Sequence, residues 1–97
     1  MYLIEFTEEA ADDVAGLRRF DQVRVMGAIE TQLSHEPAKQ TRNRKRLRPN
    51  RLAEWALRVD NFRVFYDVGL SEQIVRIVAV GEKIGNELQI RGEKFEL

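Results

Sequence analysis

The chain lacks several residues on which common functions depend. It has no cysteine, one histidine, two prolines and no long run of apolar residues. Without cysteine there is no disulfide and no thiol nucleophile, which suits the reducing cytoplasm where we expect the protein to act. A single histidine argues against a metal site, and we expect no cofactor. The start at Met1–Glu5 lacks the basic and apolar parts of a signal peptide, so we expect no membrane association.

Charge is plentiful but unevenly distributed. The 97 residues include 16 Lys+Arg and 16 Asp+Glu, so the formal net charge is zero. Outside residues 42–51 the balance is 10 − 16 = −6, because this basic segment holds six cations and no acid: Arg42, Arg44, Lys45, Arg46, Arg48 and Arg51. Such segregation predicts contact with a polyanion, and we expect these six residues to bind RNA. The alternative is a solvated loop that neutralises the protein's own acidic helices.

The first third of the chain predicts a strand and two helices. Tyr2–Phe6 is rich in strand-forming residues. Thr7 is a suitable N-cap for a first helix, whose C-terminal end we expect at Arg18–Arg19. Asp21 is a suitable N-cap for a second helix, which Pro37 ends. Because few residues separate the two helices, they should form an antiparallel hairpin. The apolar stripe predicted for the second helix consists of Met26, Ile29 and Leu33 with Val23 or Val25.

The remainder predicts a surface loop over residues 38–51 and then three strands. Trp55–Val59 and Phe62–Val68 alternate with period two about a tight turn, which indicates a hairpin. Ile74–Val80 is almost continuously apolar and favours a central strand. The tail after Ile84 should be extended and partly packed. The chain is therefore expected to be one α+β domain: an N-terminal strand, an antiparallel helix hairpin and a three-strand antiparallel meander packed on the helices.

Period two also decides which side chains share a face of the hairpin. One set should face the helices: Trp55, Leu57, Val59, Phe62, Val64 and Tyr66. The open face then carries Glu54, Arg58 and Arg63, with Phe65 as an exposed aromatic. Arginines bind phosphates, a carboxylate accepts a proton, and an aromatic ring stacks on a base. RNA cleavage needs these functions together. The alternatives without a role in cleavage are that Glu54 is simply exposed to solvent and that Arg58 pairs with a neighbouring aspartate.

Two segments of the strand region form an ordered motif. Residues 55–68 have the sequence WALRVDNFRVFYDV, and residues 77–83 have the sequence IVAVGEK. A leucine-arginine pair, a short turn, an arginine and a tyrosine are thus followed by an apolar strand that ends in glycine and a basic residue. This combination resembles the RelE/ParE superfamily, the toxins of bacterial type II toxin–antitoxin systems. The resemblance follows the family's element order over nearly the whole chain and implies a RelE-like fold.

The resemblance also implies an activity and roles for single residues. RelE-like members cleave mRNA in the ribosomal A site, and a cognate antitoxin wraps and inactivates them. By this resemblance Arg63 and Lys83 would hold the scissile phosphate, Arg58 would assist, and Glu54 or Glu82 would serve as a base. We therefore expect a ribosome-dependent mRNA endoribonuclease that inhibits translation without a metal. Its partners would be the ribosome, mRNA and an antitoxin, the last in a hetero-oligomeric complex, with the basic segment as an anchor on ribosomal RNA.

Three departures from the family pattern keep other functions open. Glu54 and Ala56 stand where the best-known member has lysines. Lys83 replaces an arginine, which keeps the charge but loses the bidentate fork. Gln89 lies about where RelE-like enzymes have a catalytic tyrosine. One alternative is a ParE-like inhibitor of DNA gyrase, which needs no nuclease chemistry. The other is a non-toxic member that acts only as an antitoxin-binding partner.

Overall fold

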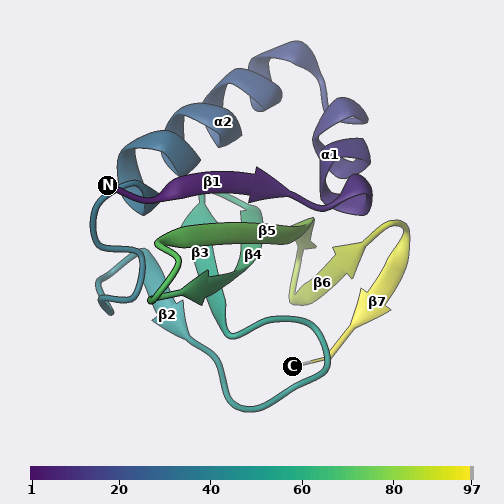
Figure 1. Cartoon of the computed structure of the whole chain (residues 1–97). Helices are drawn as coiled ribbons and strands as arrows, with labels where there is room; N and C mark the ends of the chain where they lie inside the picture. Colours follow the sequence, from purple (N-terminus) through teal and green to yellow (C-terminus); the bar gives the residue numbers. More distant parts are fainter. Residues whose placement is uncertain (97) are drawn as a thin grey trace.

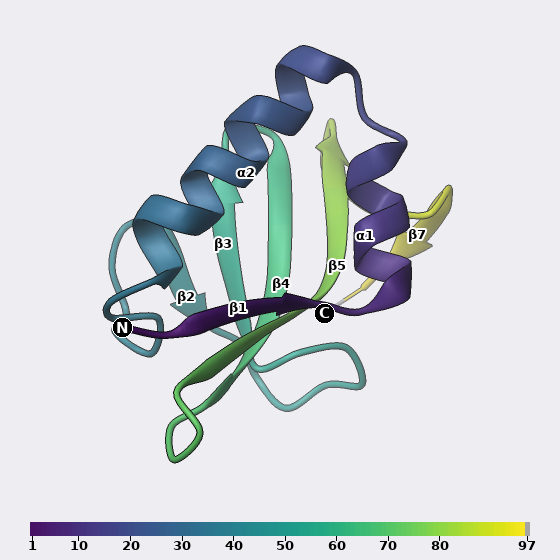
Figure 2. The same cartoon turned by 45° about the horizontal axis from the view of Figure 1, so that its top comes forward.

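Two helices cover one face of a twisted sheet in the computed structural model, which describes residues 1–96 (Figures 1 and 2). The elements in chain order are β1 (Leu3–Phe6), α1 (Glu8–Ala15), α2 (Arg19–Leu33), β2 (Arg44–Arg46), β3 (Trp55–Val59), β4 (Phe62–Gly69), β5 (Ile74–Ile84), β6 (Glu87–Ile90) and β7 (Glu93–Phe95). The sheet order is β2-β3-β4-β5-β6-β7, with β1 beside β5. The α+β prediction is confirmed. The predicted meander forms the centre of a larger sheet, with seven strands in the described residues.

Strand β5 holds the sheet together because it has neighbours along both edges. One edge pairs with β4 in antiparallel fashion. The other edge is shared: β1 pairs with Ile74–Ile77 in parallel, and β6 pairs with Glu82–Ile84 in antiparallel fashion. A bulge in the pairing with β4 leaves Val78 outside the register. Its carbonyl accepts hydrogen bonds from Thr7 Oγ1 at 3.4 Å and from Arg91 Nη2 at 3.2 Å. Two side chains therefore satisfy the carbonyl oxygen at the bulge.

The helix starts follow the sequence signals only in part. Thr7 caps α1 as predicted, and its hydroxyl accepts a hydrogen bond from the Ala10 amide at 3.1 Å. The prediction that Arg18 and Arg19 end the first helix is wrong, as is the prediction that Asp21 caps the second. Arg18 is the N-cap position of α2 and Arg19 its first residue. Asp21 lies in the first turn, where its buried carboxylate pairs with Arg18 at 3.3 Å.

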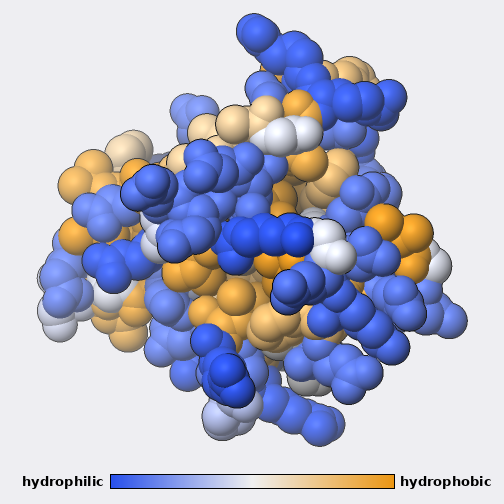
Figure 3. Space-filling model, turned by 90° about the vertical axis from the view of Figure 1, so that its right-hand side faces the viewer, coloured by the Kyte–Doolittle hydropathy of each residue, from blue (hydrophilic) through white to orange (hydrophobic). Residues whose placement is uncertain are grey.

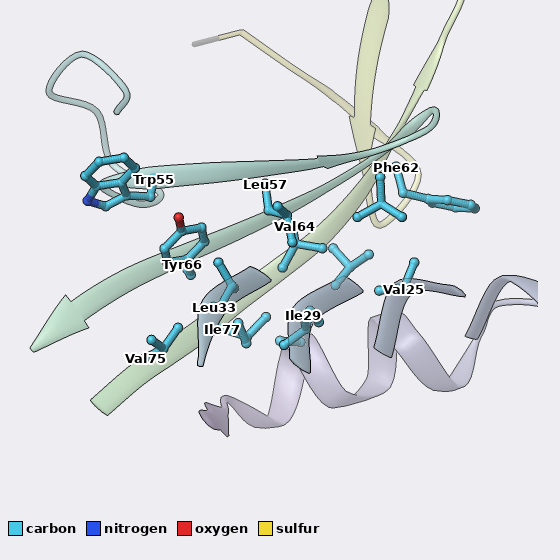
Figure 4. Packing of buried hydrophobic residues seen from close by; sticks show 13 residues of the cluster. Val25, Ile29, Leu33, Trp55, Leu57, Phe62, Val64, Tyr66, Val75 and Ile77 are labelled. Atoms are coloured by element: carbon cyan, nitrogen blue, oxygen red, sulfur yellow. The ribbon is translucent and has the colours of Figure 1, made fainter. Parts of the chain in front are cut away.

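The main core lies between α2 and the sheet. Val25, Ile29 and Leu33 are buried on α2 at helical spacing, and Figure 4 shows them pointing toward the strands. The strand residues predicted to face the helices are all buried there: Trp55, Leu57, Val59, Phe62, Val64 and Tyr66. Met26 and Val23 of the predicted stripe are instead exposed. A shift of one residue, about 100° around the helix axis, decides this, because Val25 and not Met26 falls on the line through Ile29 and Leu33.

A second, smaller core lies on the opposite face of the sheet, and it overturns one prediction. Phe65 points away from the helices as expected, but only 1% of its surface is exposed. It packs with Ala53, Ala79 and Ile90, and with partly buried residues of the chain's tail that include Leu88. The hairpin β6–β7 folds over this face and covers the ring. Phe65 is therefore not the exposed stacking aromatic that strand alternation alone suggested.

Gly81 permits that covering hairpin to come close. A Cβ atom at this position would lie 2.8 Å from the Gln89 carbonyl oxygen and 2.8 Å from Ile90 Cγ1. Contacts of that length are too short for carbon, so only glycine allows β6 to bend against β5 here.

The predicted surface loop over residues 38–51 is partly wrong. Its residues Arg44–Arg46 form β2, an edge strand that pairs with β3. The outer edge of β2 is capped locally: the Arg46 amide donates to Gln40 Oε1 at 3.2 Å, and the Thr41 amide donates to the Arg44 carbonyl at 2.9 Å. A basic strand with a capped edge resists pairing with other chains.

The surface is strongly polar. Figure 3, which faces the side of α1 and β7, shows hydrophilic side chains over most of the surface with apolar atoms visible between them. Among residues 1–96 no helix is long and apolar enough to cross a membrane.

Candidate functional site: a cationic concavity

A concavity of about 650 Å³ on the face opposite the helices gathers most of the cations that the sequence singled out. Its charged lining residues are Arg42, Lys45, Arg46, Arg48, Arg58, Arg63 and Lys83. Its other lining residues are Asn43, Leu47, Ala56, Phe65 and Leu88. The lining contains seven cations and no carboxylate. Within the described part of the chain, none of the seven takes part in an ion pair. We call this feature the cationic concavity.

Strand register explains why three of these cations lie in one row. Arg58 of β3 is directly opposite Arg63 of β4. Arg63 is in turn opposite Gly81 of β5, and Lys83 lies two residues further along the same face of β5. Gly81 adds no side chain to the row. The two hairpins β3–β4 and β4–β5 thus assemble a cationic row from residues that are up to 25 positions apart in the sequence.

The charge of Arg63 is poorly compensated. Its guanidinium is half-buried and donates to two carbonyl oxygens, that of Asp60 at 2.8 Å and that of Phe62 at 2.9 Å. Burial lowers the pKa of Arg63, and repulsion from Arg58 lowers it further. An arginine still keeps its proton at neutral pH, so the lowered pKa reports an unfavourable environment for the cation and not its loss. An anion placed between Arg58 and Arg63 would relieve that repulsion. Uncompensated charge of this kind in a concave site indicates a binding function.

Strand β2 divides the basic segment between two faces of the sheet. Lys45 is opposite Ala56 and faces the cationic concavity. Arg44 is opposite Leu57 and faces the helices. Its guanidinium donates to the Lys39 carbonyl at 3.1 Å and to the Gln32 carbonyl near the end of α2. The negative end of the helix dipole favours a cation there. Arg44 therefore fastens the basic segment to α2 and does not line the concavity.

The other members of the basic segment line the concavity or the hollows next to it. The Arg46 guanidinium carbon is 5.7 Å from the centre of the Trp55 ring, which stabilises the cation over the aromatic face. Arg48 lines both the cationic concavity and a neighbouring hollow, and Arg51 lines that hollow alone. Arg42 and Arg58 also line a groove at the edge of β3 beside α2. The cations thus continue around the edge of the sheet.

The structure does not bring the expected carboxylates to Arg63. Glu54 lies at the other end of the β3–β4 hairpin, where its Oε1 accepts a hydrogen bond from the Val68 amide at 3.3 Å. Glu82 alternates with Lys83 and so points to the other face, where it accepts from Asn61 Nδ2 at 3.2 Å. Gln89, the residue near the expected tyrosine position, pairs with Glu82 and does not line the concavity.

Sequence reasoning missed three lining residues, Asn43, Leu47 and Leu88. Asn43 precedes β2, and its carbonyl accepts a hydrogen bond from the Arg58 amide at 2.8 Å. Leu88 comes from β6, and the apolar pattern of the tail was the only signal for it. In the part of the chain that the structure describes, no group of three histidine, cysteine, aspartate or glutamate side chains could hold a metal.

Comparison with known proteins identifies the class. The family model described as the ParE toxin of the type II toxin–antitoxin system parDE matches residues 4–83. The chain therefore belongs to the ParE toxin family within the RelE/ParE superfamily, and the resemblance proposed from the sequence is confirmed. The protein is a toxin of a type II toxin–antitoxin system. No curated protein matches the chain.

Three solved structures share the fold. The RelBE2 toxin–antitoxin complex of Mycobacterium tuberculosis contains a chain with 26% identity and a TM-score of 0.72, and the match covers 84% of this chain and 96% of that one. The archaeal RelE–RelB complex of Pyrococcus horikoshii OT3 matches with 15% identity and a TM-score of 0.69 over 84% and 94%. The RelBE complex of E. coli matches with 18% identity and a TM-score of 0.59 over 84% and 96%. These matches confirm the RelE-like fold.

Proposed function

We propose that this toxin is a ribosome-dependent mRNA endoribonuclease that inhibits translation, and that the cationic concavity binds the RNA backbone. The observation that carries the proposal is the lining of seven cations without a carboxylate, centred on Arg58 and Arg63. A chain of phosphates neutralises such a surface with favourable release of counterions. Cytoplasmic RNA on the ribosome is a polyanion of the required kind.

The chemistry that this surface supports is electrostatic. In RNA cleavage the neighbouring 2′-hydroxyl gives up its proton to water and its oxygen attacks the phosphorus. The bond from phosphorus to the 5′-oxygen then breaks, and the 5′-oxygen takes a proton from water, while negative charge accumulates on the phosphate oxygens during the step. Arg63 can hold two of these oxygens through its fork, while Lys83 acts as a point charge and Arg58 assists. The hydrogen bonds from Arg63 to the Asp60 and Phe62 carbonyls fix the fork before RNA arrives. Glu54 and Glu82 lie elsewhere, so stabilisation of charge is the main contribution of these residues.

An antitoxin should cover the same surface. The similar solved structures are toxin–antitoxin complexes. We propose that the cognate antitoxin places acidic side chains in the cationic concavity and so competes directly with RNA. This arrangement predicts a hetero-oligomeric complex in which Arg58 and Arg63 are paired with carboxylates of the partner.

One alternative has specific support. The matching family model is that of ParE toxins, and the superfamily's ParE-like members inhibit DNA gyrase. The lining of the concavity has no histidine, tyrosine or carboxylate that could transfer a proton. A protein-binding role at gyrase would need none. Under this alternative the cations of the concavity would contact acidic protein surface or DNA instead of message.

The two functions are separated by expressing the toxin with and without its antitoxin. Translation, message integrity and DNA-damage signalling are followed after induction. The proposal predicts loss of translation with cut message, and predicts that Arg63→Ala restores both. A DNA-damage response with intact message would support gyrase inhibition. Growth unaffected by the wild-type protein would indicate a non-toxic, antitoxin-binding member.

A further inference from the structure

The loop between β2 and β3 carries two of the cations of the basic segment. Hydrogen bonds within the loop hold its backbone in place, and we call this network the frame of the loop. This connection stands out from the sheet in Figure 1. Arg48 and Arg51 are exposed on it. A loop that projects into solvent would ordinarily be mobile, and a mobile cation loses conformational freedom when it binds a phosphate. The frame of the loop therefore bears on how strongly these arginines bind RNA.

The frame is built by the side chain of Asn50, which lies between the two arginines. Its Oδ1 accepts hydrogen bonds from the Leu52 amide at 2.7 Å and the Ala53 amide at 3.0 Å. Its Nδ2 donates to the Arg48 carbonyl at 2.6 Å and the Ala53 carbonyl at 2.9 Å. A carboxamide can accept two hydrogen bonds and donate two, so the whole capacity of this side chain is used on the loop's own backbone.

The frame is anchored to the sheet at its base. Ala53 is buried in the second core, and Leu52 packs against the same cluster. The Leu47 amide donates to the Glu54 carbonyl at 2.8 Å, which closes the loop. Asn50 thus connects the backbone next to each arginine to residues that cannot move without disturbing the core.

We infer that Asn50 is a positioning residue for RNA binding: it holds Arg48 and Arg51 in place for the phosphate backbone without contacting RNA itself. The inference rests on the proposed function, because it assumes that the basic segment binds RNA. A carboxamide is required at this position. Aspartate could accept the two amide hydrogen bonds but not donate to the two carbonyls, and it would place a negative charge beside the arginines.

The test measures the affinity of a short single-stranded RNA for the purified full-length toxin over a range of salt concentrations. Asn50→Ala should bind about tenfold more weakly than wild type at physiological salt, because four hydrogen bonds no longer order the loop. The slope of log K against log salt should stay the same, because every cation is still present. Arg48→Ala, in contrast, should reduce that slope by about one. The matched control is Asn86→Ala in the turn between β5 and β6, which should bind like wild type.

A second measurement does not depend on a variant. Amide hydrogen exchange in the wild-type protein should show protection at Leu52 and Ala53, the two amides bonded to Asn50 Oδ1. Exchange of both amides at unfolded-chain rates would overturn the inference, as would an Asn50→Ala protein with wild-type affinity. Failure of the wild-type protein to bind RNA at all would overturn the proposed function together with this inference, so the two failures are distinguishable.

Discussion

Arg58 and Arg63 are directly opposite one another on β3 and β4, and both line a concavity that contains no carboxylate. Cross-strand pairs of like charge destabilise a hairpin. Neither arginine forms an ion pair with any residue that the structure describes. The arrangement therefore lowers the stability of the free toxin and favours any anion that occupies the site. This exchange of stability for binding is common at functional sites.

Removal of one of the two charges should stabilise the free protein and weaken its function. Arg58→Gln keeps much of the side chain but relieves the repulsion on Arg63. We expect the melting temperature to rise by roughly two degrees while RNA binding falls. Arg76→Gln is the control, since Arg76 has an acidic neighbour, Glu5 at 3.8 Å, and should gain no stability. A melting temperature lowered equally by both changes would contradict the account.

Inorganic phosphate should stabilise the wild-type protein through the same pair. At a phosphate concentration ten times Kd, mass action predicts a gain of about 1.4 kcal/mol in the free energy of unfolding. Thermal unfolding in phosphate is compared with unfolding in chloride of equal ionic strength. The gain should disappear in Arg63→Gln. An identical gain in that variant would place the phosphate elsewhere.

Tyr66 should contribute a hydrogen bond and a dependence of stability on alkaline pH. Its buried hydroxyl donates to the Pro37 carbonyl at 2.8 Å, and burial raises the pKa of the phenol. Since the folded state holds the phenol proton more tightly than the unfolded state, the stabilising effect is complete below about pH 10 and is lost as pH rises beyond it. Tyr66→Phe should cost about 1 kcal/mol at pH 7.

The measurement for Tyr66 is denaturant unfolding of both proteins between pH 7 and pH 11. The difference in unfolding free energy between wild type and Tyr66→Phe should shrink above pH 10. A difference that stays constant across this range would show that the phenol proton does not contribute.

Two glycines should respond in opposite directions to the same substitution. Gly81→Ala would place a Cβ 2.8 Å from β6 backbone and side-chain atoms, and we expect a loss of about 1–3 kcal/mol in the free energy of unfolding. Gly27→Ala is the matched control, because nothing lies within 4 Å of its Cβ position on the exposed side of α2. It should gain about 0.5–1 kcal/mol. Both values come from denaturant unfolding, and a stable Gly81→Ala protein would contradict the packing of β6 on β5.

Local patterns predicted the parts of the fold that depend on period and capping. Alternation correctly placed Trp55, Leu57 and Tyr66 in the main core, and the hydroxyl of Thr7 marked the start of α1. The prediction that Asp21 caps α2 was wrong because an acid in the first turn of a helix resembles an N-cap in sequence. A three-residue basic strand such as β2 has no apolar pattern, so its pairing with β3 was not predictable from local sequence.

The candidate site was predicted less completely than the fold, because long-range packing decides which side chains remain accessible. Arg58, Arg63 and Lys83 share one face, as strand periodicity and the family resemblance implied. Phe65 lies on that face but is covered by β6–β7, a hairpin whose position depends on contacts far along the chain. Glu54 shares the hairpin with Arg63 but lies beyond its reach, because strand residues are separated by more than 3 Å each.

Cleavage of message on purified ribosomes tests directly whether this toxin is an mRNA endoribonuclease. Wild-type toxin, Arg63→Ala and Asn86→Ala are each added to ribosomes programmed with a defined mRNA, and cut sites are mapped by primer extension. If Arg63 holds the scissile phosphate, wild type and Asn86→Ala should cut the message in the A site, and Arg63→Ala should leave it intact. Intact message with the wild-type toxin, together with inhibition of gyrase supercoiling by the same preparation, would contradict the proposed function.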